Sequence, residues 1–218
     1  MQLTTRRPAG DAGFTLIELL ICIVILGIIA VPLGNAIISY SKNQDATAQR
    51  MALSHDGQIS TAYFSRDVVA VGVRDYAGVP DASGNLPYKQ SIQLNAAYNS
   101  GGLTCGDATT PQALVRFLSD DWDHSDPANP KVVTGIVAYY LVPVGTVDEL
   151  HRIKCSGSAT PLSSAVLAHN VDPSTVNLTC SSSCTATTVP QQVNLAFTVT
   201  SPNGATYPIA LTGQRRQT

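Results

Sequence analysis

One stretch near the N-terminus reads Gly13-Phe14-Thr15-Leu16-Ile17-Glu18 and continues directly into Leu19-Leu20-Ile21. The apolar block over residues 14–38 spans 25 residues and contains one charge, Glu18. As a helix, this block is about 37 Å long at about 1.5 Å per residue, which is enough to cross a hydrocarbon core of about 30 Å. The pattern therefore predicts a membrane-spanning helix with one acid near its start.

The segment before this block, residues 1–13, is short and polar and carries Arg6 and Arg7. Basic residues ahead of an apolar segment keep that end in the cytoplasm and direct the rest of the chain across the membrane. Such a segment is a secretory signal peptide, a signal anchor or a prepilin leader. Glu18 favours the last, because a carboxylate in an apolar helix opposes insertion unless it gains a partner. A signal peptide cut near Ala36, with an accidental glutamate, is the alternative.

The string from Gly13 to Glu18 resembles the processing signal of type IV prepilins and type II secretion pseudopilins. The resemblance implies that a prepilin peptidase cuts between Gly13 and Phe14 and methylates the new amine of Phe14. It also makes Glu18 the assembly glutamate, five places into the mature chain. Cleavage creates a cation one helical turn from Glu18, and opposite charges attract strongly where water is scarce. In the family, the amine and the glutamate pair between neighbouring subunits, although an intrachain contact is also possible.

Beyond the apolar block, residues 39–75 are expected to continue the helix, with its well-supported part ending near Val69. A stripe at spacings of three and four predicts the face that packs on a sheet: Ala48, Met51, Ala52, His55, Ile59, Ala62 and Tyr63. Gly27 and Pro32 interrupt the apolar part, where either a kink or local loosening is expected.

A turn-rich loop over residues 76–87 follows, and the rest of the chain is typical of strands. The expected strands are Ser91–Leu94, Ala113–Leu118, Val132–Val142, Glu149–Cys155, Ala165–Asn170, Thr175–Thr179, Val193–Thr200 and Thr206–Leu211. Turn residues at 142–146 and 201–204 predict two hairpins. The fold class is therefore α+β, with one long N-terminal helix packed on an antiparallel β-sheet.

This layout is similar to the lollipop shape of pilins, with a leader over 1–13, an assembly helix over 14–38, a soluble helix half over 39–75 and a β-rich ectodomain over 76–218. Three short strings resemble J-type minor pseudopilins or PilW-like minor pilins: Arg66-Asp67-Val68-Val69, Tyr139-Tyr140-Leu141 and Leu150-His151-Arg152. The mature chain of 218 − 13 = 205 residues is larger than most major pilins. Retention of Glu18 argues against the absolute tip subunit.

Five cysteines divide into one in the apolar block, Cys22, and four beyond it, Cys105, Cys155, Cys180 and Cys184. Four cysteines after an export segment predict two disulfides in an oxidising compartment. Three pairings are possible. Pairing Cys105 with Cys155 and Cys180 with Cys184 is preferred, because the last two are close and flank a serine-rich turn. No Cys-x-x-Cys pair points to zinc, and Cys22 is interpreted as a small apolar side chain in lipid.

The most polar cluster lies over residues 119–127 and is expected to form a loop. Its carboxylates, Asp120, Asp121, Asp123 and Asp126, are a candidate calcium site, although a solvated turn is favoured. The four histidines, His55, His124, His151 and His169, are scattered, without the spacing of a metal site on one helix face. No metal, cofactor or catalytic motif is indicated.

The sequence thus predicts a minor pilin or pseudopilin that is not an enzyme and that initiates a filament or lies near its tip. Its expected partners are prepilin peptidase, sibling subunits, the inner-membrane assembly platform and membrane lipid. The expected location is a single-pass membrane protein with its ectodomain outside, later part of a surface or periplasmic filament. A net charge of −2 and a pI near 6.0 do not indicate DNA binding. The alternative function is a signal-anchored extracellular binding domain that does not assemble.

Overall fold

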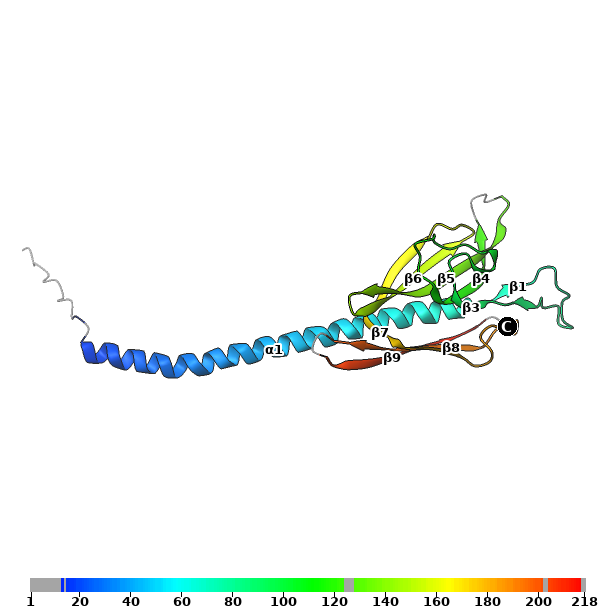
Figure 1. Ribbon diagram of the computed structural model, residues 1–218. Coiled ribbons are helices and arrows are strands. Elements are labelled where there is room, and N and C mark those ends of the chain that lie inside the picture. The colour runs from blue at the N-terminus through cyan, green and yellow to red at the C-terminus, as the bar shows by residue number, and fades with distance from the viewer. Residues whose placement is uncertain (1–12, 14, 124–127, 202–203, 217–218) are drawn as a thin grey trace, which may run out of the picture. The chain divides into compact units, whose positions relative to one another are not determined.

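The computed structural model describes residues 13, 15–123, 128–201 and 204–216 (Figure 1). The chain divides into two units, Met1–Gln49 and Arg50–Thr218. Helix α1, Leu16–Val69, contains 54 residues and contributes to both units. Pro32 lies inside this helix, and the helical assignment continues through it. The helix ends at Val69, where the well-supported part of the prediction ends. The expected continuation of the helix to residue 75 is wrong, because residues 73–74 form a short strand.

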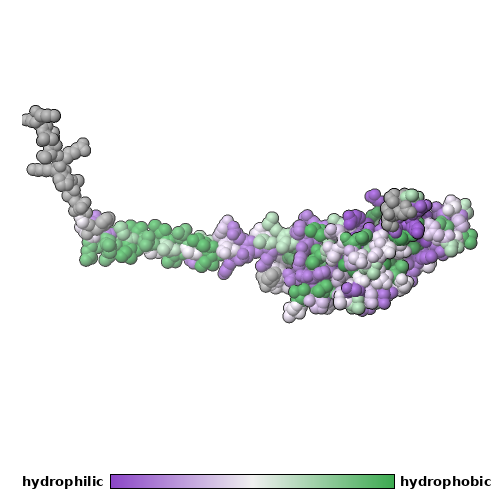
Figure 2. Space-filling model, turned by 90° about the horizontal axis from the view of Figure 1, so that it is seen from above, coloured by the Kyte–Doolittle hydropathy of each residue, from purple (hydrophilic) through white to green (hydrophobic). Residues whose placement is uncertain are grey.

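The first unit, in its described part, is the N-terminal portion of α1. It contains a stretch long and apolar enough to cross a membrane, and none of that stretch is buried within the protein. Figure 2 shows the surface of this apolar stretch as mostly hydrophobic, with hydrophilic colour on the helix after it. A helix that is apolar on all sides belongs in an apolar environment, so this unit is suited to lipid and to other apolar helices.

The second unit is built on an antiparallel sheet. In the described residues this sheet has seven strands in sequential order, from β3 to β9. Their bounds are β3 Ile92–Ala96, β4 Ala113–Asp123, β5 Lys131–Val144, β6 Val147–Ser156, β7 Ser163–Cys180, β8 Gln192–Thr200 and β9 Thr206–Gln214. A small ladder joins β1, Val73–Arg74, to β2, Tyr88–Lys89. The 3-10 turn η1, Ser100–Gly102, lies between β3 and β4.

The sheet is curled around the C-terminal part of α1. In Figure 1, β4 to β6 lie on one side of that part of the helix and β8 with β9 lie on the other. The sheet passes from one side of the helix to the other at β7, whose pairing with β8 shifts in register between Asp172 and Asn177. The sequence predicts two strands there, Ala165–Asn170 and Thr175–Thr179, whereas the structure has one long irregular strand. Both predicted hairpins are present, although residues 202 and 203 lie outside the described part.

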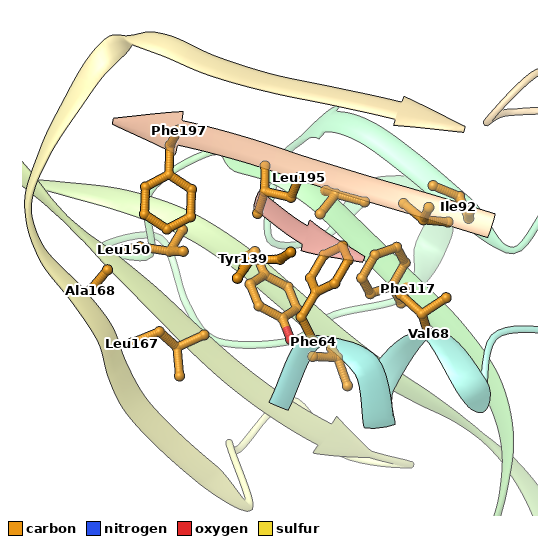
Figure 3. Close-up of a cluster of buried hydrophobic side chains, with 14 of the residues drawn as sticks. Phe64, Val68, Ile92, Phe117, Tyr139, Leu150, Leu167, Ala168, Leu195 and Phe197 are labelled. Atoms are coloured by element: carbon orange, nitrogen blue, oxygen red, sulfur yellow. The ribbon is translucent and has the colours of Figure 1, made fainter. Parts of the chain in front are cut away.

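The core lies between α1 and the concave face of the sheet. Phe64, Phe117 and Tyr139 meet there edge to face, with ring centroids 5.6–5.8 Å apart (Figure 3). Val68 on the next helical turn is also fully buried. Edge-to-face pairs add about 0.5–1.5 kcal/mol each beyond the burial of their area. The aromatic cluster therefore joins the helix to the two strands β4 and β5.

The prediction of which helix face packs on the sheet is wrong for most of its residues. Met51, Ala52, His55 and Ala62 are exposed, and only Ile59 and Tyr63 of the stripe pack on the core. The buried helical positions are Ser60, Phe64, Asp67 and Val68. Two of these four, Ser60 and Asp67, are polar. A face predicted from apolar residues alone therefore differs from the face that is buried. Ser60 is tolerated because its hydroxyl donates to the backbone oxygen of Leu167 at 2.8 Å.

Candidate functional site

The start of α1 is a capping box made by Thr15 and Glu18. The backbone N–H and the hydroxyl of Thr15 both donate to Oε2 of Glu18, at 3.0 and 2.9 Å. The N–H of Glu18 lies 3.4 Å from Oγ1 of Thr15, which completes the reciprocal pattern. A threonine followed three residues later by a glutamate is the sequence signature of this motif. Glu18 thus has a local role in addition to the assembly role expected of it.

Gly13 is exposed, and Phe14 lies outside the described residues, so the structure does not define the processing point. The apolar side chains that follow are largely exposed, for example Leu16 at 83%, Leu26 at 70% and Ile28 at 69%. Cys22 is exposed and is a free thiol. A continuous exposed apolar surface of this length marks a membrane or protein interaction site. The single carboxylate of Glu18 lies at its beginning.

A second cluster joins the helix to the sheet through buried charges. Asp67 accepts from Arg152 at both carboxylate oxygens, from Nε at 2.6 Å and from Nη2 at 2.7 Å. The hydroxyl of Tyr139 donates to the same carboxylate at 2.6 Å. The guanidinium of Arg152 also lies over the ring of Tyr63, 4.9 Å from its centroid. The side chains of Arg152 and Asp67 are 1% and 5% exposed, so this is a fully buried bidentate ion pair.

The surroundings of Arg152 and Tyr139 favour a charged guanidinium and a neutral phenol. Burial lowers the pKa of Arg152, but the hydrogen bonds and the charge of Asp67 outweigh that effect and raise it overall. Burial and the Asp67 carboxylate raise the pKa of Tyr139 far above its ordinary value. The phenol therefore remains a donor at any physiological pH. All three residues come from the strings that resemble minor pilins, and the structure brings those strings together at one point.

The candidate calcium residues do not form a loop site. Asp120, Asp121 and Asp123 lie in strand β4, so the predicted loop over residues 119–127 is wrong for residues 119–123. Asp120 accepts from the backbone of Arg74 and from the Tyr76 hydroxyl, both at 3.2 Å. Asp121 lies 3.6 Å from Lys154. Because adjacent strand residues face opposite sides of a sheet, Asp120 points away from the side on which Asp121 and Asp123 lie. Asp126 and His124 lie outside the described residues.

Two of the histidines, His151 and His169, lie near the same carboxylate, that of Glu149. Glu149 lies 2.9 Å from Nε2 of His151 and 3.9 Å from Nε2 of His169, and Nδ1 of His169 lies 2.9 Å from Asp56 on the helix. The cluster links α1, β6 and β7 on the surface. No group of three or more acidic, histidine or cysteine side chains suited to a metal ion occurs in the described part of the chain.

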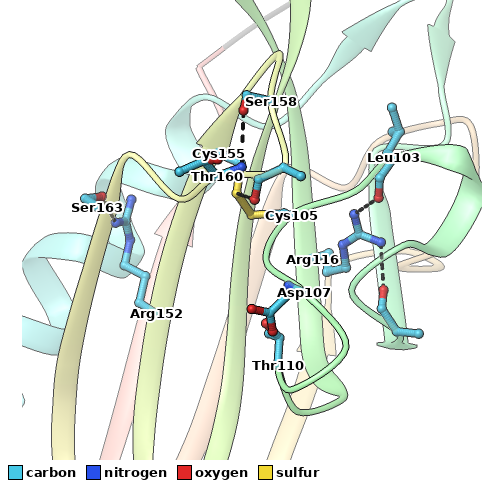
Figure 4. The surroundings of a disulfide bond; sticks show 12 residues. Leu103, Cys105, Asp107, Thr110, Arg116, Arg152, Cys155, Ser158, Thr160 and Ser163 are labelled. Atoms are coloured by element: carbon cyan, nitrogen blue, oxygen red, sulfur yellow. Dashed lines mark hydrogen bonds between the residues drawn. A yellow bond between two sulfur atoms is a disulfide. The ribbon is translucent and has the colours of Figure 1, made fainter.

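Both preferred disulfides are present in the structure, Cys105 to Cys155 and Cys180 to Cys184. The first ties the loop before β4 to strand β6 (Figure 4). Beside it, the buried Arg116 donates to the backbone oxygens of Ala97, Ser100 and Leu103. Burial lowers the pKa of Arg116. The sequence does not predict this role, because an arginine in a strand carries no signal of its backbone acceptors.

Comparison with known proteins adds one finding. Residues 9–34 match the family described as the prokaryotic N-terminal methylation motif. No curated protein and no solved structure matches the chain. The matched segment contains the Gly13–Phe14 junction, Glu18 and most of the apolar block, and it supports the type IV prepilin-like family. The chain therefore carries the N-terminal signature of a pilin or pseudopilin that is processed by prepilin peptidase.

Proposed function

We propose that this chain is a minor pilin or pseudopilin, with a structural and not a catalytic role, that enters a filament through its N-terminal helix. The observation that carries the proposal is a lone carboxylate, Glu18, at the start of an exposed apolar helix that bears the methylation motif. Neither lipid nor the apolar side chains of the helix offer that carboxylate a counter-charge. A neighbouring subunit with a processed amine does.

The capping box leaves room for this second role. Both donors of Thr15 use Oε2 of Glu18, and no residue in the described part of the chain donates to Oε1. One carboxylate oxygen is therefore available to an amine while the other caps the helix. We infer that capping orients the carboxylate and that the amine of an adjacent mature subunit binds the free oxygen. In water-poor surroundings such a pair fixes the axial register between two helices.

The proposed location follows from the same helix. The apolar part of α1 spans the cytoplasmic membrane before assembly, with the second unit outside, and the expected partners are prepilin peptidase, sibling subunits and the assembly platform. The two disulfides of the second unit agree with an oxidising compartment. A minor role, in initiation or near the tip, rests on the size of the mature chain and on the three short strings described above.

The experiment compares Glu18→Ala with Thr15→Ala in cells that assemble the filament. We expect Glu18→Ala to insert into the membrane and to be processed but to be lost from sheared filaments. Thr15→Ala removes the two contacts of the Thr15 hydroxyl but keeps the carboxylate and the bond from the backbone N–H of residue 15, so it should remain in filaments. Mass spectrometry of the wild-type N-terminus should show Phe14 carrying one added methyl group.

Four results would overturn the proposal. An unprocessed N-terminus would exclude prepilin maturation, and a start near Ile37 would identify a signal peptide. Normal incorporation of Glu18→Ala would show that the carboxylate does not direct assembly. If Glu18→Ala and Thr15→Ala were lost from filaments to the same extent, the role of Glu18 would be to cap the helix and not to bind a neighbouring amine. An anchored binding domain that does not assemble would then be the better interpretation.

A further inference from the structure

The second unit contains an open pocket of about 580 Å³ formed by three segments that are far apart in sequence. Tyr88 comes from β2, Arg215 follows β9, and Ser181, Ser182, Thr187 and Thr188 come from the connection between β7 and β8. We call it the Arg215 pocket. The Cys180–Cys184 disulfide closes the beginning of that connection.

Backbone hydrogen bonds hold the walls of the Arg215 pocket in place. The N–H of Arg215 donates to the oxygen of Gln191 at 2.8 Å, and that of Ser181 donates to Gln192 at 2.9 Å. The hydroxyl oxygen of Ser181 accepts from the N–H groups of Gln191 and Gln192, both at 3.1 Å. The pocket is therefore largely formed before any ligand arrives, which lowers the entropic cost of binding.

Two arginine side chains bring positive charge to this region. The guanidinium of Arg215 lies 4.8 Å from the centroid of the Tyr88 ring, and that of Arg74 lies 5.5 Å from it. Within the described residues, neither arginine forms an ion pair. The atoms Nε and Nη1 of Arg215 and the hydroxyl of Tyr88 are buried without a hydrogen-bond partner there. Unpaired buried polar groups are costly and call for an explanation.

The lining of the pocket suits an anion better than a cation. None of its residues carries a carboxylate, so nothing in it attracts a cation. The hydroxyls of Ser182, Thr187 and Thr188 are on exposed residues and make no hydrogen bond within the described part of the chain. A guanidinium beside several free hydroxyls is a donor set for an oxyanion, because arginine presents a planar fork that fits carboxylate and phosphate oxygens.

We propose that the Arg215 pocket binds a small oxyanion, a carboxylate or a phosphate group, through Arg215 and the neighbouring hydroxyls. Arg74 lies over the same Tyr88 ring and adds positive charge near the pocket. The anion supplies a counter-charge to the Arg215 guanidinium, which forms no ion pair within the described residues. Every residue of the site belongs to the second unit, so this proposal does not rest on the proposed function.

The test titrates the full chain, in detergent micelles, with inorganic phosphate and separately with galacturonate, with chloride as the control anion. Two-dimensional NMR should show saturable shifts of the amides at residues 181–191 and 215. We expect Arg215→Gln to weaken binding by about tenfold or more, while Arg216→Gln, its exposed neighbour, should bind as the wild type does. Saturable shifts with phosphate alone identify the ligand as a phosphate group, and shifts with galacturonate alone identify it as a carboxylate.

The proposal is wrong if neither probe gives a saturable shift up to about 10 mM, a very weak affinity, or if the shifts map away from the pocket. It is also wrong if Arg216→Gln loses binding as fully as Arg215→Gln, since the effect would then be one of net charge. Should Arg215→Gln fail to fold, the position of the shifts in the wild-type spectrum still decides the matter.

Discussion

Asp67 connects the helix to the sheet through more charged contacts than any other described residue of α1. Its carboxylate binds Arg152 of β6 at both oxygens and accepts from Tyr139 of β5. A buried ion pair adds little net stability by itself, because desolvation offsets much of the attraction. The loss of one partner is different, because the other charge then remains buried without compensation.

Asp67→Asn is therefore expected to destabilise the second unit by about 3–5 kcal/mol. The measurement is chemical denaturation followed by circular dichroism, with Asp45→Asn as the control, an exposed carboxylate on the same helix. The control should change stability by about 0.5 kcal/mol or less. A small effect of Asp67→Asn would mean that water reaches Arg152 and replaces the lost contact.

At the scale of elements, the contact between α1 and β9 depends on a glycine. A Cβ on Gly213 would overlap the side chain of the fully buried Val68. Gly57 on the helix has nothing within 4 Å of such a Cβ. The two glycines therefore test close packing and helix propensity separately.

Gly213→Ala should destabilise the protein by about 1–3 kcal/mol through overpacking. Gly57→Ala should stabilise it by up to about 1 kcal/mol, because alanine favours the helix. Thermal unfolding of both variants checks the pair. Equal effects of the same sign would show that Val68 moves aside freely and that the approach of α1 to β9 is not close.

The two disulfides constrain very different lengths of chain, with sequence separations of 50 and 4. In the loop-entropy account, removal of Cys105–Cys155 by paired serine substitutions costs about 4 kcal/mol, and removal of Cys180–Cys184 costs about 2 kcal/mol. The first loss is increased further because Cys105 and Cys155 are buried in a small apolar cluster. Denaturation midpoints of the two double variants measure this order. The reverse order would show that the first loop is already held by Arg116.

At the scale of the whole molecule, the two units differ in what surrounds them. The second unit has its own core, to which α1 contributes Phe64 and Val68. A chain of residues 50–218 should therefore fold without detergent and remain monomeric, because the exposed apolar part of α1 is absent. Sedimentation and circular dichroism test this. Aggregation of this fragment would show that residues before Arg50 protect an apolar surface of the second unit.

The sequence by itself determined the membrane-type helix, the end of its well-supported part near Val69 and an antiparallel strand-rich domain. It also carries the methylation motif over residues 9–34, while cleavage between Gly13 and Phe14 stays a prediction. These features are encoded locally, by apolar run length, by a short motif and by turn residues. The assembly role of Glu18 stays a prediction from the same signal. The capping box with Thr15 is local too, and its Thr-x-x-Glu signature is readable in the sequence.

Only the tertiary structure decided which helical face is buried and how the charged residues are paired. Asp67, Tyr139 and Arg152 are separated by up to 85 residues, and nothing local indicates that they meet. The same holds for Arg116 with its backbone acceptors and for Arg215 with Tyr88. Buried polar groups find partners wherever the curled sheet brings them, so their roles depend on contacts between distant strands and not on the pattern around each residue.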